Sequence, residues 1–257
     1  MGHSLFSLRQ DIAEVGKRMY ARGYVASNDG NISARLDDNK VLVTPTGVSK
    51  GFMKPEDLIV VNMEGKVLSG TKKPSSEVFM HLQVYKDRPD VNSVCHAHPP
   101  YATGFAVAGI PLDKCILPEV IITLGSIPLI EYGTPGTEEL YRPVTELLKD
   151  YDAFLLANHG ALTVGNDVIN AYHKMETLEH FAQIAFVAQQ LGYVNILSKE
   201  QVQKLKEQRE KFGISTGAGC VSNKNDSSTM KSTPKTNSIN DDLIKEITEQ
   251  LLKQIRK

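Results

Sequence analysis

The chain has 257 residues, of which 41% are hydrophobic, and its formal net charge is −1. This length and composition are typical of one sizeable globular domain with room for an appendage. A charge near zero gives no electrostatic basis for binding nucleic acid or an anionic membrane, and no apolar run is long enough to span a bilayer. We therefore expect neither partner.

The three cysteines, Cys95, Cys115 and Cys220, are scattered and odd in number. Such a pattern argues against a disulfide framework and favours a reducing compartment. The N-terminus, residues 1–5, lacks the basic start and long apolar core of a secretory signal. We therefore expect a cytoplasmic protein.

The N-terminal segment predicts a helix followed by a polar loop. Leu5 to Arg22 has apolar residues at helical spacing and ends at Gly23. The stretch 27–33 is small and polar, and its Asp-Gly pair is a strong signal for a hairpin turn. An alternative is an anion-binding loop, in which free N–H groups and the Asn28 amide hold a phosphate. Taken alone, the stretch favours the hairpin turn.

Three strands are predicted next, at 40–45, 58–62 and 67–69. Their alternation and the intervening turns indicate an antiparallel meander. After the first strand, Thr46 and Gly47 form another small pair with a free hydroxyl and an accessible amide.

A helix is predicted over 78–85, with Ser75 or Ser76 as its N-cap. A helix start with serine hydroxyls and free N–H groups binds anions readily. Glu77 lies in the first turn, and we expect His81 on the helix surface or partly in the core.

The second half of the chain mixes strands and helices without a strict β-α-β alternation. The expected elements are a strand stopped by two prolines after His98, a helix over 101–108, strand pieces within 121–130, a helix from Thr137 to about 149, strands at 153–157 and 161–164, and a helix over 167–191. The last helix carries His173 and His180, which we expect to face solvent or a subunit contact. This order predicts an α/β fold with a mostly antiparallel or mixed sheet and helices on both faces.

Three histidines and one glutamate predict a metal site. His96 and His98 flank Ala97 at a strand end, so both imidazoles point to one side. His159 follows the apolar run 153–157, and Glu77 offers a carboxylate from its turn. One such histidine alone would be read as an ordinary polar residue at a strand end. Together the four suit zinc, and manganese or cobalt would fit similar ligands.

The C-terminal tail has a different composition. A charged helix over 199–212 completes the main domain, 1–212, and residues 213–239 are rich in Ser, Thr, Asn, Gly and Lys, which predicts a flexible linker. Residues 240–257 predict a short amphipathic helix, with an apolar face of Leu243, Ile244, Ile247, Leu251, Leu252 and Ile255. It could fold back on its own domain, lie on a membrane surface or dock on a partner, and we favour docking because the linker separates it from the domain.

Five motifs occur in one order: Asn28–Ser33, Thr44–Gly47, Pro74–Glu77, His96–His98 and Asn158–Gly160. Together they closely resemble the class II aldolase/adducin family, over about residues 5–195. The likeness is strongest to its members that cleave L-fuculose 1-phosphate. It implies a three-layer α/β/α sandwich, a homotetramer, and zinc held by Glu77, His96, His98 and His159. It also implies a substrate phosphate bound by the loops that contain Asn28, Gly30, Asn31, Thr46, Gly47, Ser75 and Ser76.

The chemistry that this resemblance implies is reversible aldol cleavage. Zinc would bind the carbonyl and hydroxyl oxygens of the ketose and stabilise the enediolate that forms as the carbon–carbon bond breaks. Glu77, displaced from the metal by substrate, would carry a proton. The products would be dihydroxyacetone phosphate and L-lactaldehyde.

Two alternatives lie within the same family. Ribulose-5-phosphate 4-epimerases resemble Ser-Ser-Asp at the metal turn and His-Ala-Asp-Tyr downstream, whereas this chain has Glu77 in the turn and Leu117 to Val120 downstream, which favours the aldolase. The fuculose-phosphate enzymes are expected to have a downstream tyrosine that protonates across a subunit boundary; none is found here, and Glu119 is the candidate second proton donor. A non-catalytic, adducin-like binding module is disfavoured because all four ligands are present.

The tail is similar to the encapsulation peptides that target enzymes into bacterial microcompartments. The resemblance implies that residues 240–257 bind a shell protein and that the enzyme works inside such a compartment.

Overall fold

A single eight-stranded sheet lies at the centre of the computed structural model, which describes residues 4–214, 219, 220 and 222. Its order is β4-β3-β2-β1-β5-β8-β7-β6, and every neighbouring pair is antiparallel except β6 and β7. The strands are β1 (Asn31–Asp37), β2 (Lys40–Val43), β3 (Ile59–Asn62), β4 (Val67–Ser69), β5 (Ser93–Ala97), β6 (Leu129–Ile130), β7 (Ala153–Leu156) and β8 (Gly160–Gly165). The prediction of a mostly antiparallel, mixed sheet is confirmed.

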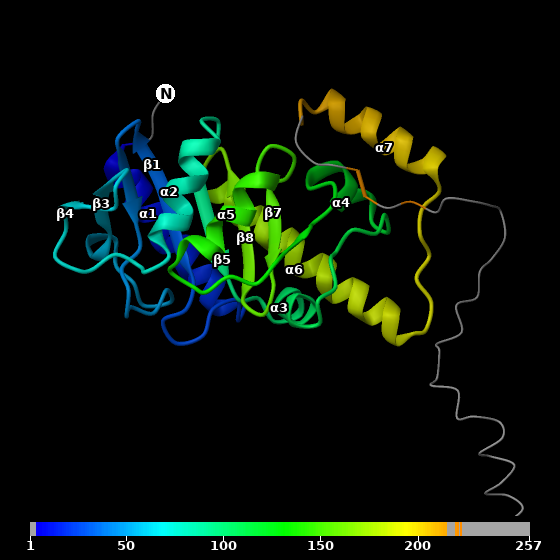
Figure 1. Cartoon of the computed structure of the whole chain (residues 1–257), viewed down its shortest axis with the longest axis horizontal. Helices are drawn as coiled ribbons and strands as arrows, with labels where there is room; N and C mark the ends of the chain where they lie inside the picture. Colours follow the sequence, from blue (N-terminus) through cyan, green and yellow to red (C-terminus); the bar gives the residue numbers. More distant parts are fainter. Residues whose placement is uncertain (1–3, 215–218, 221, 223–257) are drawn as a thin grey trace, which may run out of the picture.

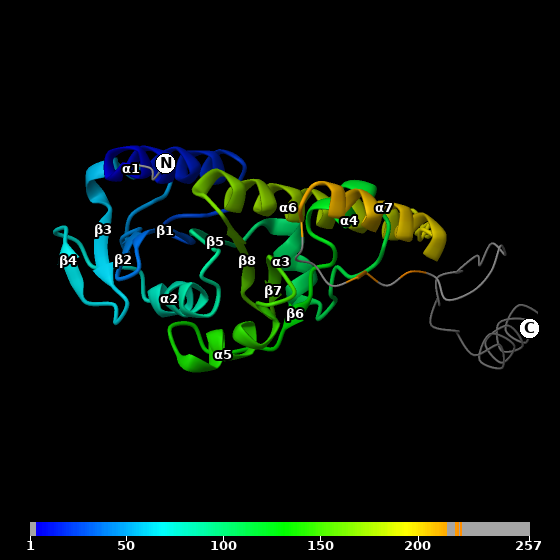
Figure 2. The same cartoon turned by 90° about the horizontal axis from the view of Figure 1, so that it is seen from above.

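Helices cover both faces of this sheet, so the expected three-layer α/β/α architecture is also confirmed (Figures 1 and 2). On one face lie α1 (Leu5–Ala21), α3 (Pro100–Val107), α4 (Pro118–Thr123), α6 (Val168–Gln190) and α7 (Lys199–Lys211). On the other face lie α2 (Val78–Asp87) and α5 (Glu138–Leu147). Each face has its own buried apolar core. No helix of the described residues is long and apolar enough to cross a membrane.

The alternation of side chains along β5 decides which layer receives which residue. Cys95 and Ala97 belong to the core under α1 and α6, whereas Val94 belongs to the core under α2 and α5. Because successive residues of a strand point to opposite faces, His96 lies on the α2 side with Val94. The strand therefore places this histidine in the layer where α2 begins.

Two local predictions are wrong. The stretch 27–33 is not a hairpin turn between two strands: it leads from α1 into β1, which starts immediately after Gly30. The polar residues on β1 conceal the alternation that would have predicted a strand. Within 121–130, the first part is helical, because α4 begins at Pro118 and proline is well suited to a first helical turn.

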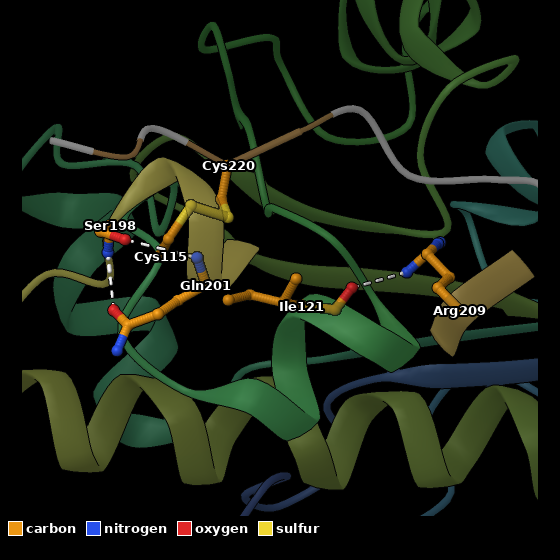
Figure 3. Close-up of a disulfide and its surroundings, with 6 residues drawn as sticks. All are labelled: Cys115, Ile121, Ser198, Gln201, Arg209 and Cys220. Carbon is orange, nitrogen blue, oxygen red and sulfur yellow. Dashed lines mark hydrogen bonds between the residues drawn. A yellow bond between two sulfur atoms is a disulfide. The ribbon is translucent and has the colours of Figure 1, made fainter. Parts of the chain in front are cut away.

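The expectation that the cysteines form no disulfide is wrong for two of the three residues. Cys115 and Cys220 form a disulfide with a Cα–Cα distance of 5.2 Å (Figure 3). Cys95 is free and buried. Cys220 lies in the predicted linker, and only tertiary packing brings it to Cys115, so the cysteine basis for a reducing compartment is removed. The amphipathic segment 240–257 lies outside the described residues, and the predicted domain limits stay predictions.

Candidate metal centre

Three imidazoles converge beside the end of β5. His96 lies at the end of that strand, His98 follows it, and His159 lies in the connection between β7 and β8. One nitrogen of each ring lies within 4.8 Å of the others. The ring centroids are 4.7 to 5.1 Å apart. The structure therefore brings together histidines that are far apart in the sequence, as the motif analysis predicted.

Glu77 completes the cluster from the turn before α2. Its Oε2 is 3.3 Å from His96 Nε2, and its Oε1 is 3.1 Å from His159 Nε2. The side chain of Glu77 is 11% exposed, and those of His96 and His159 are 0% and 10% exposed. All four predicted ligands thus share one largely buried space.

The capping prediction for α2 is wrong, for a reason connected with this site. The N-cap residue is Glu77, not Ser75 or Ser76, and its side chain makes no capping hydrogen bond. The carboxylate is turned toward the imidazoles instead, and the Ser75 hydroxyl accepts a hydrogen bond from Glu77 N at 3.3 Å.

Backbone conformation at the β7–β8 connection presents His159. Asn158 adopts a φ of 56°, a left-handed conformation that asparagine tolerates better than most residues. At Gly160 an added Cβ would lie 2.5 Å from Ala97 O and 2.6 Å from His98 Cδ2. Only glycine lets β8 approach the β5 end this closely, and this approach puts His159 against His98.

Hydrogen bonds around the cluster fix the direction of two ligands. His96 Nδ1 is 2.9 Å from Ala161 O. A carbonyl can only accept, so Nδ1 carries the hydrogen and Nε2 keeps its lone pair for the site. Asn31 Nδ2 donates to Glu77 Oε2 at 2.7 Å. His98 Nδ1 lies 3.4 Å from Asp29 Oδ2, the carboxylate–histidine arrangement common around metal ligands.

The protonation states suit a divalent cation. Burial lowers the pKa of His96 to about 4, against the attraction of the Glu77 carboxylate. Burial also opposes ionisation of Glu77, but His96, His159 and Asn31 outweigh it and hold the pKa of this carboxyl below its ordinary value. At neutral pH the His96 Nε2 lone pair therefore faces a carboxylate oxygen with no proton between them. His98 Nε2 is likewise buried without a hydrogen-bond partner. A cation between these atoms satisfies them, so the residues fit a metal.

The three loops predicted to bind phosphate lie side by side near this cluster. Thr46 N donates to Lys73 O at 3.0 Å, which joins the second loop to the third. Lys50 Nζ donates to Asn28 O at 2.9 Å, which joins the first loop to the second. Of the predicted residues, Ser75 is partly buried, and those exposed to solvent are Asn28, Thr46, Gly47 and Ser76.

Two residues of the predicted phosphate set have other contacts. The Asn31 amide donates to Glu77, as described, and the residue is buried. A Cβ at Gly30 would lie 2.8 Å from His96 O, so this glycine permits close packing of β1 against β5. Their part in phosphate binding stays a prediction.

Glu119 is not joined to the cluster by any contact among the described residues. It is exposed in the first turn of α4, a helix that packs against α6 and α7. Its role as second proton donor stays a prediction, and a neighbouring subunit would be needed to fulfil it. His173 and His180 are exposed, as expected.

Sequence reasoning missed four residues around the site. Asp29 lies beside Asn28 in a motif already noted, so its position was a usable signal. Nothing local indicated that Lys50 is buried beneath the loops, or that Ser33 and His81 form a buried hydrogen bond of 2.7 Å. The expectation of a surface or half-buried His81 is wrong, since only 2% of it is exposed.

Comparison with known proteins places these features in a family. A family model described as Class II Aldolase and Adducin N-terminal domain matches residues 10–186. The chain is 35% identical over 181 residues to an L-fuculose phosphate aldolase of Methanococcus maripaludis, across 70% of this chain and 97% of that one. It is 36% identical over 185 residues to a 3-oxo-tetronate 4-phosphate decarboxylase of Escherichia coli, across 70% and 87%.

Two further likenesses cover more of the chain. A 5-deoxy-D-ribulose 1-phosphate aldolase of Bacillus thuringiensis is 33% identical over 207 residues, across 80% of this chain and 96% of that one. A solved structure of an L-fuculose 1-phosphate aldolase superposes with a TM-score of 0.73 at 30% identity, across 79% of this chain and 96% of that one. The names of these relatives differ in substrate and, for one, in reaction.

Proposed function

The chain belongs to the class II aldolase and adducin family, and from this membership we propose that it is a divalent-metal-dependent aldolase that reversibly cleaves a ketose 1-phosphate. The observation that carries the proposal is the cluster of His96, His98 and His159 beside the Glu77 carboxylate. The proposed substrate is L-fuculose 1-phosphate, and the proposed products are dihydroxyacetone phosphate and L-lactaldehyde. An adducin-like binding module without catalysis would not need this set of three imidazoles and a carboxylate.

Glu77, His96, His98 and His159 would hold the cation, and we propose zinc because three imidazoles and one carboxylate suit it. When bound, the cation would polarise the carbonyl and hydroxyl oxygens of the ketose. Glu77 is ionised at neutral pH and is the residue proposed to accept and return a proton during cleavage. The Asn31 amide holds the carboxylate from the side, which orients it for this task.

The phosphate of the substrate is proposed to bind at the three adjoining loops. The proposed ligands are the exposed hydroxyls and amides of Asn28, Thr46, Gly47 and Ser76 and the partly buried Ser75, and backbone N–H groups in such loops form concave anion sites. The loops end close to the metal cluster, since Ser75 and Glu77 share a hydrogen bond. A ketose 1-phosphate could therefore reach the cation with its oxygens while its phosphate stays in the loops.

Assembly and location are further parts of the proposal. A homotetramer would bring Glu119 of one subunit toward the cluster of another and complete the second proton transfer. Residues 240–257 are proposed to dock on the shell protein of a bacterial microcompartment, which would confine the aldehyde product. Fusion of this tail to a fluorescent protein tests the docking, because diffuse fluorescence in shell-forming cells, unchanged by Ile247→Asp, would contradict it.

The experiment that tests the function is a coupled assay for dihydroxyacetone phosphate. The purified, metal-loaded protein is given L-fuculose 1-phosphate, L-rhamnulose 1-phosphate, 5-deoxy-D-ribulose 1-phosphate and L-ribulose 5-phosphate, with and without chelator. We expect chelator-sensitive release from a ketose 1-phosphate, greatest with L-fuculose 1-phosphate, and loss of both bound metal and activity in His159→Ala.

Other outcomes would replace the proposal. Interconversion of ribulose and xylulose 5-phosphates would make the protein an epimerase. In a separate assay with 3-oxo-tetronate 4-phosphate, release of carbon dioxide, with no cleavage of the ketoses, would make it a decarboxylase like the Escherichia coli relative. Stoichiometric metal with no turnover of any of these compounds would contradict catalysis on sugar phosphates.

A further inference from the structure

Lys50 is a buried cation beneath two of the loops proposed to bind phosphate. The residue is 1% exposed. Its Nζ donates to Asn28 O and to Val48 O, each at 2.9 Å. The first carbonyl belongs to the loop before β1, and the second belongs to the loop that contains Thr46 and Gly47. One ammonium group therefore fixes the spacing between the two loops.

The backbone at Lys50 is itself held by α1. An added Cβ at Gly16 of α1 would lie 2.7 Å from Lys50 O, and one at Gly51 would lie 2.4 Å from the ring of Tyr20. Both contacts are closer than any side chain larger than glycine permits. The ammonium is thus placed by a rigid helix and not by a mobile surface segment.

The charge of Lys50 is only partly compensated. Within the part of the chain that the structure describes, the ammonium forms no ion pair, and its hydrogen-bond acceptors are neutral carbonyls. Burial lowers the pKa of Lys50 to about 8, while the charges of Asp29 and Glu77 act in the opposite direction. The group is protonated at neutral pH, and a fixed positive charge in a poorly solvated place exerts a strong field on a nearby anion.

We propose that Lys50 is a positioning residue for the substrate phosphate, which sets the spacing of the Asn28 and Thr46–Gly47 loops and supplies a fixed positive charge behind them. This inference rests on the proposed function, because it takes these loops as the phosphate site. The role predicts an effect of Lys50 on the binding of phosphorylated ketoses and none on unphosphorylated ones, since only the former present a dianion to the loops.

The test compares Lys50→Met and Lys50→Arg with Lys54→Met, which removes an exposed lysine four residues further along. Calorimetry on the metal-loaded proteins measures the Kd of inorganic phosphate, and kinetics measure KM and kcat for the preferred ketose 1-phosphate and its unphosphorylated form. We expect Lys50→Met to raise the phosphate Kd and the KM of the phosphorylated ketose by about tenfold or more, the effect of losing a fixed positive charge in a poorly solvated place. The KM of the unphosphorylated ketose should not change, Lys50→Arg should restore part of the loss, and Lys54→Met should behave as wild type.

The outcomes separate this inference from the proposed function. Equal losses on both ketoses, or a change in kcat alone, would overturn the role of Lys50 while the aldolase proposal stands. A wild-type protein that neither binds phosphate nor cleaves any sugar phosphate would refute the proposed function itself. If Lys50→Met does not fold, Lys50→Gln replaces it, because an amide keeps a donor for a loop carbonyl but carries no charge; a phosphate Kd equal to that of wild type in this variant would overturn the inference.

Discussion

Polar residues on β1 connect this strand to α2 through buried hydrogen bonds. Asn31 Nδ2 donates to Glu77 Oε2, and the Ser33 hydroxyl lies 2.7 Å from both His81 Nδ1 and the Tyr85 hydroxyl. Because alternate residues of a strand point the same way, these contacts form one column between β1 and α2. The column fixes the orientation of α2 and therefore the direction of the Glu77 carboxylate.

Replacement of Asn31 by alanine should weaken metal binding. Asn31→Ala removes the donor that orients Glu77, and loss of such an outer partner lowers metal affinity by about 10- to 100-fold. The measurement is a competition titration with a metal-binding dye, with Asn39→Ala in the exposed β1–β2 turn as control. Unchanged metal affinity with weaker phosphate binding would instead support the role of Asn31 in the phosphate loop.

His81 should make stability depend on pH in acid. Burial lowers its pKa in the folded protein to about 3 from an ordinary value of 6.5. Between these two pH values the unfolded chain binds a proton at this histidine that the folded chain does not. The contribution of His81 to the free energy of unfolding therefore has its full value above about pH 6.5 and declines as pH falls toward 3. Urea unfolding measures the free energy of unfolding at about pH 4.5 and 7.5. The difference between the two pH values should be smaller for His81→Gln than for wild type. An equal difference in both proteins would show that His81 does not contribute.

At the scale of elements, the end of β5 and the start of β8 form the base of the metal site. The pair β5 and β8 is antiparallel, with His96 opposite Leu162 and Ala97 opposite Ala161. This register places the β7–β8 connection, and with it His159, beside His96 of β5 and His98, which follows that strand. The close contact of Gly160 with the His98 ring shows how little room is left between the elements.

Gly160→Ala should therefore reduce metal content and also lower stability, because the added Cβ would meet the Ala97 carbonyl as well as the His98 ring. Its Cβ would meet Ala97 O and the His98 ring, so His98 must move away from the other ligands. Metal analysis after dialysis is the measurement, and Gly104→Ala on α3 is the control, because its Cβ would meet no atom within 4 Å. A variant with full metal content would show that His98 can shift without leaving the metal.

At the scale of the whole molecule, α7 and Cys220 join the C-terminal part of the described chain to α4 and the residues just before it. Arg209 donates through Nη1 to Ile121 O and Ile122 O at 3.0 and 2.8 Å, and the disulfide joins Cys220 to Cys115 just before α4 (Figure 3). The C-terminal part of the described chain is thus linked to the segment that carries Glu119. The linked residues are 105 positions apart in the sequence.

Loss of this disulfide should lower global stability. Cys220→Ser releases the unfolded chain from a long closed loop, which typically costs about 2–4 kcal/mol of unfolding free energy. Denaturant unfolding of the oxidised wild type and the variant measures the difference. Reductant should lower the stability of wild type to that of the variant and should not affect the variant, and a wild type insensitive to reductant would contradict the pairing.

The sequence alone determined the features that depend on local periodicity and short motifs. Apolar spacing predicted α1 and α6, and strand alternation placed His96 and His98 on one side. The motifs at Glu77, His96–His98 and His159 predicted four side chains that the structure brings together, because their residue types carry the chemistry directly.

Tertiary structure alone decided what depends on long-range contacts. The pairing of β5 with β8 brings His96 and His159 together, and the Asn31–Glu77 hydrogen bond between β1 and the start of α2 adds the carboxylate. No local pattern encodes contacts between segments that are distant in the chain. It also decided that Lys50 is buried and that Cys220 meets Cys115, since burial of a polar residue depends on its partners and not on its neighbours in sequence. β1 was not predicted for the same reason. Its polar side chains are buried against α2, where hydrogen bonds satisfy them, so the strand lacks the alternation of polar and apolar residues that would have indicated it.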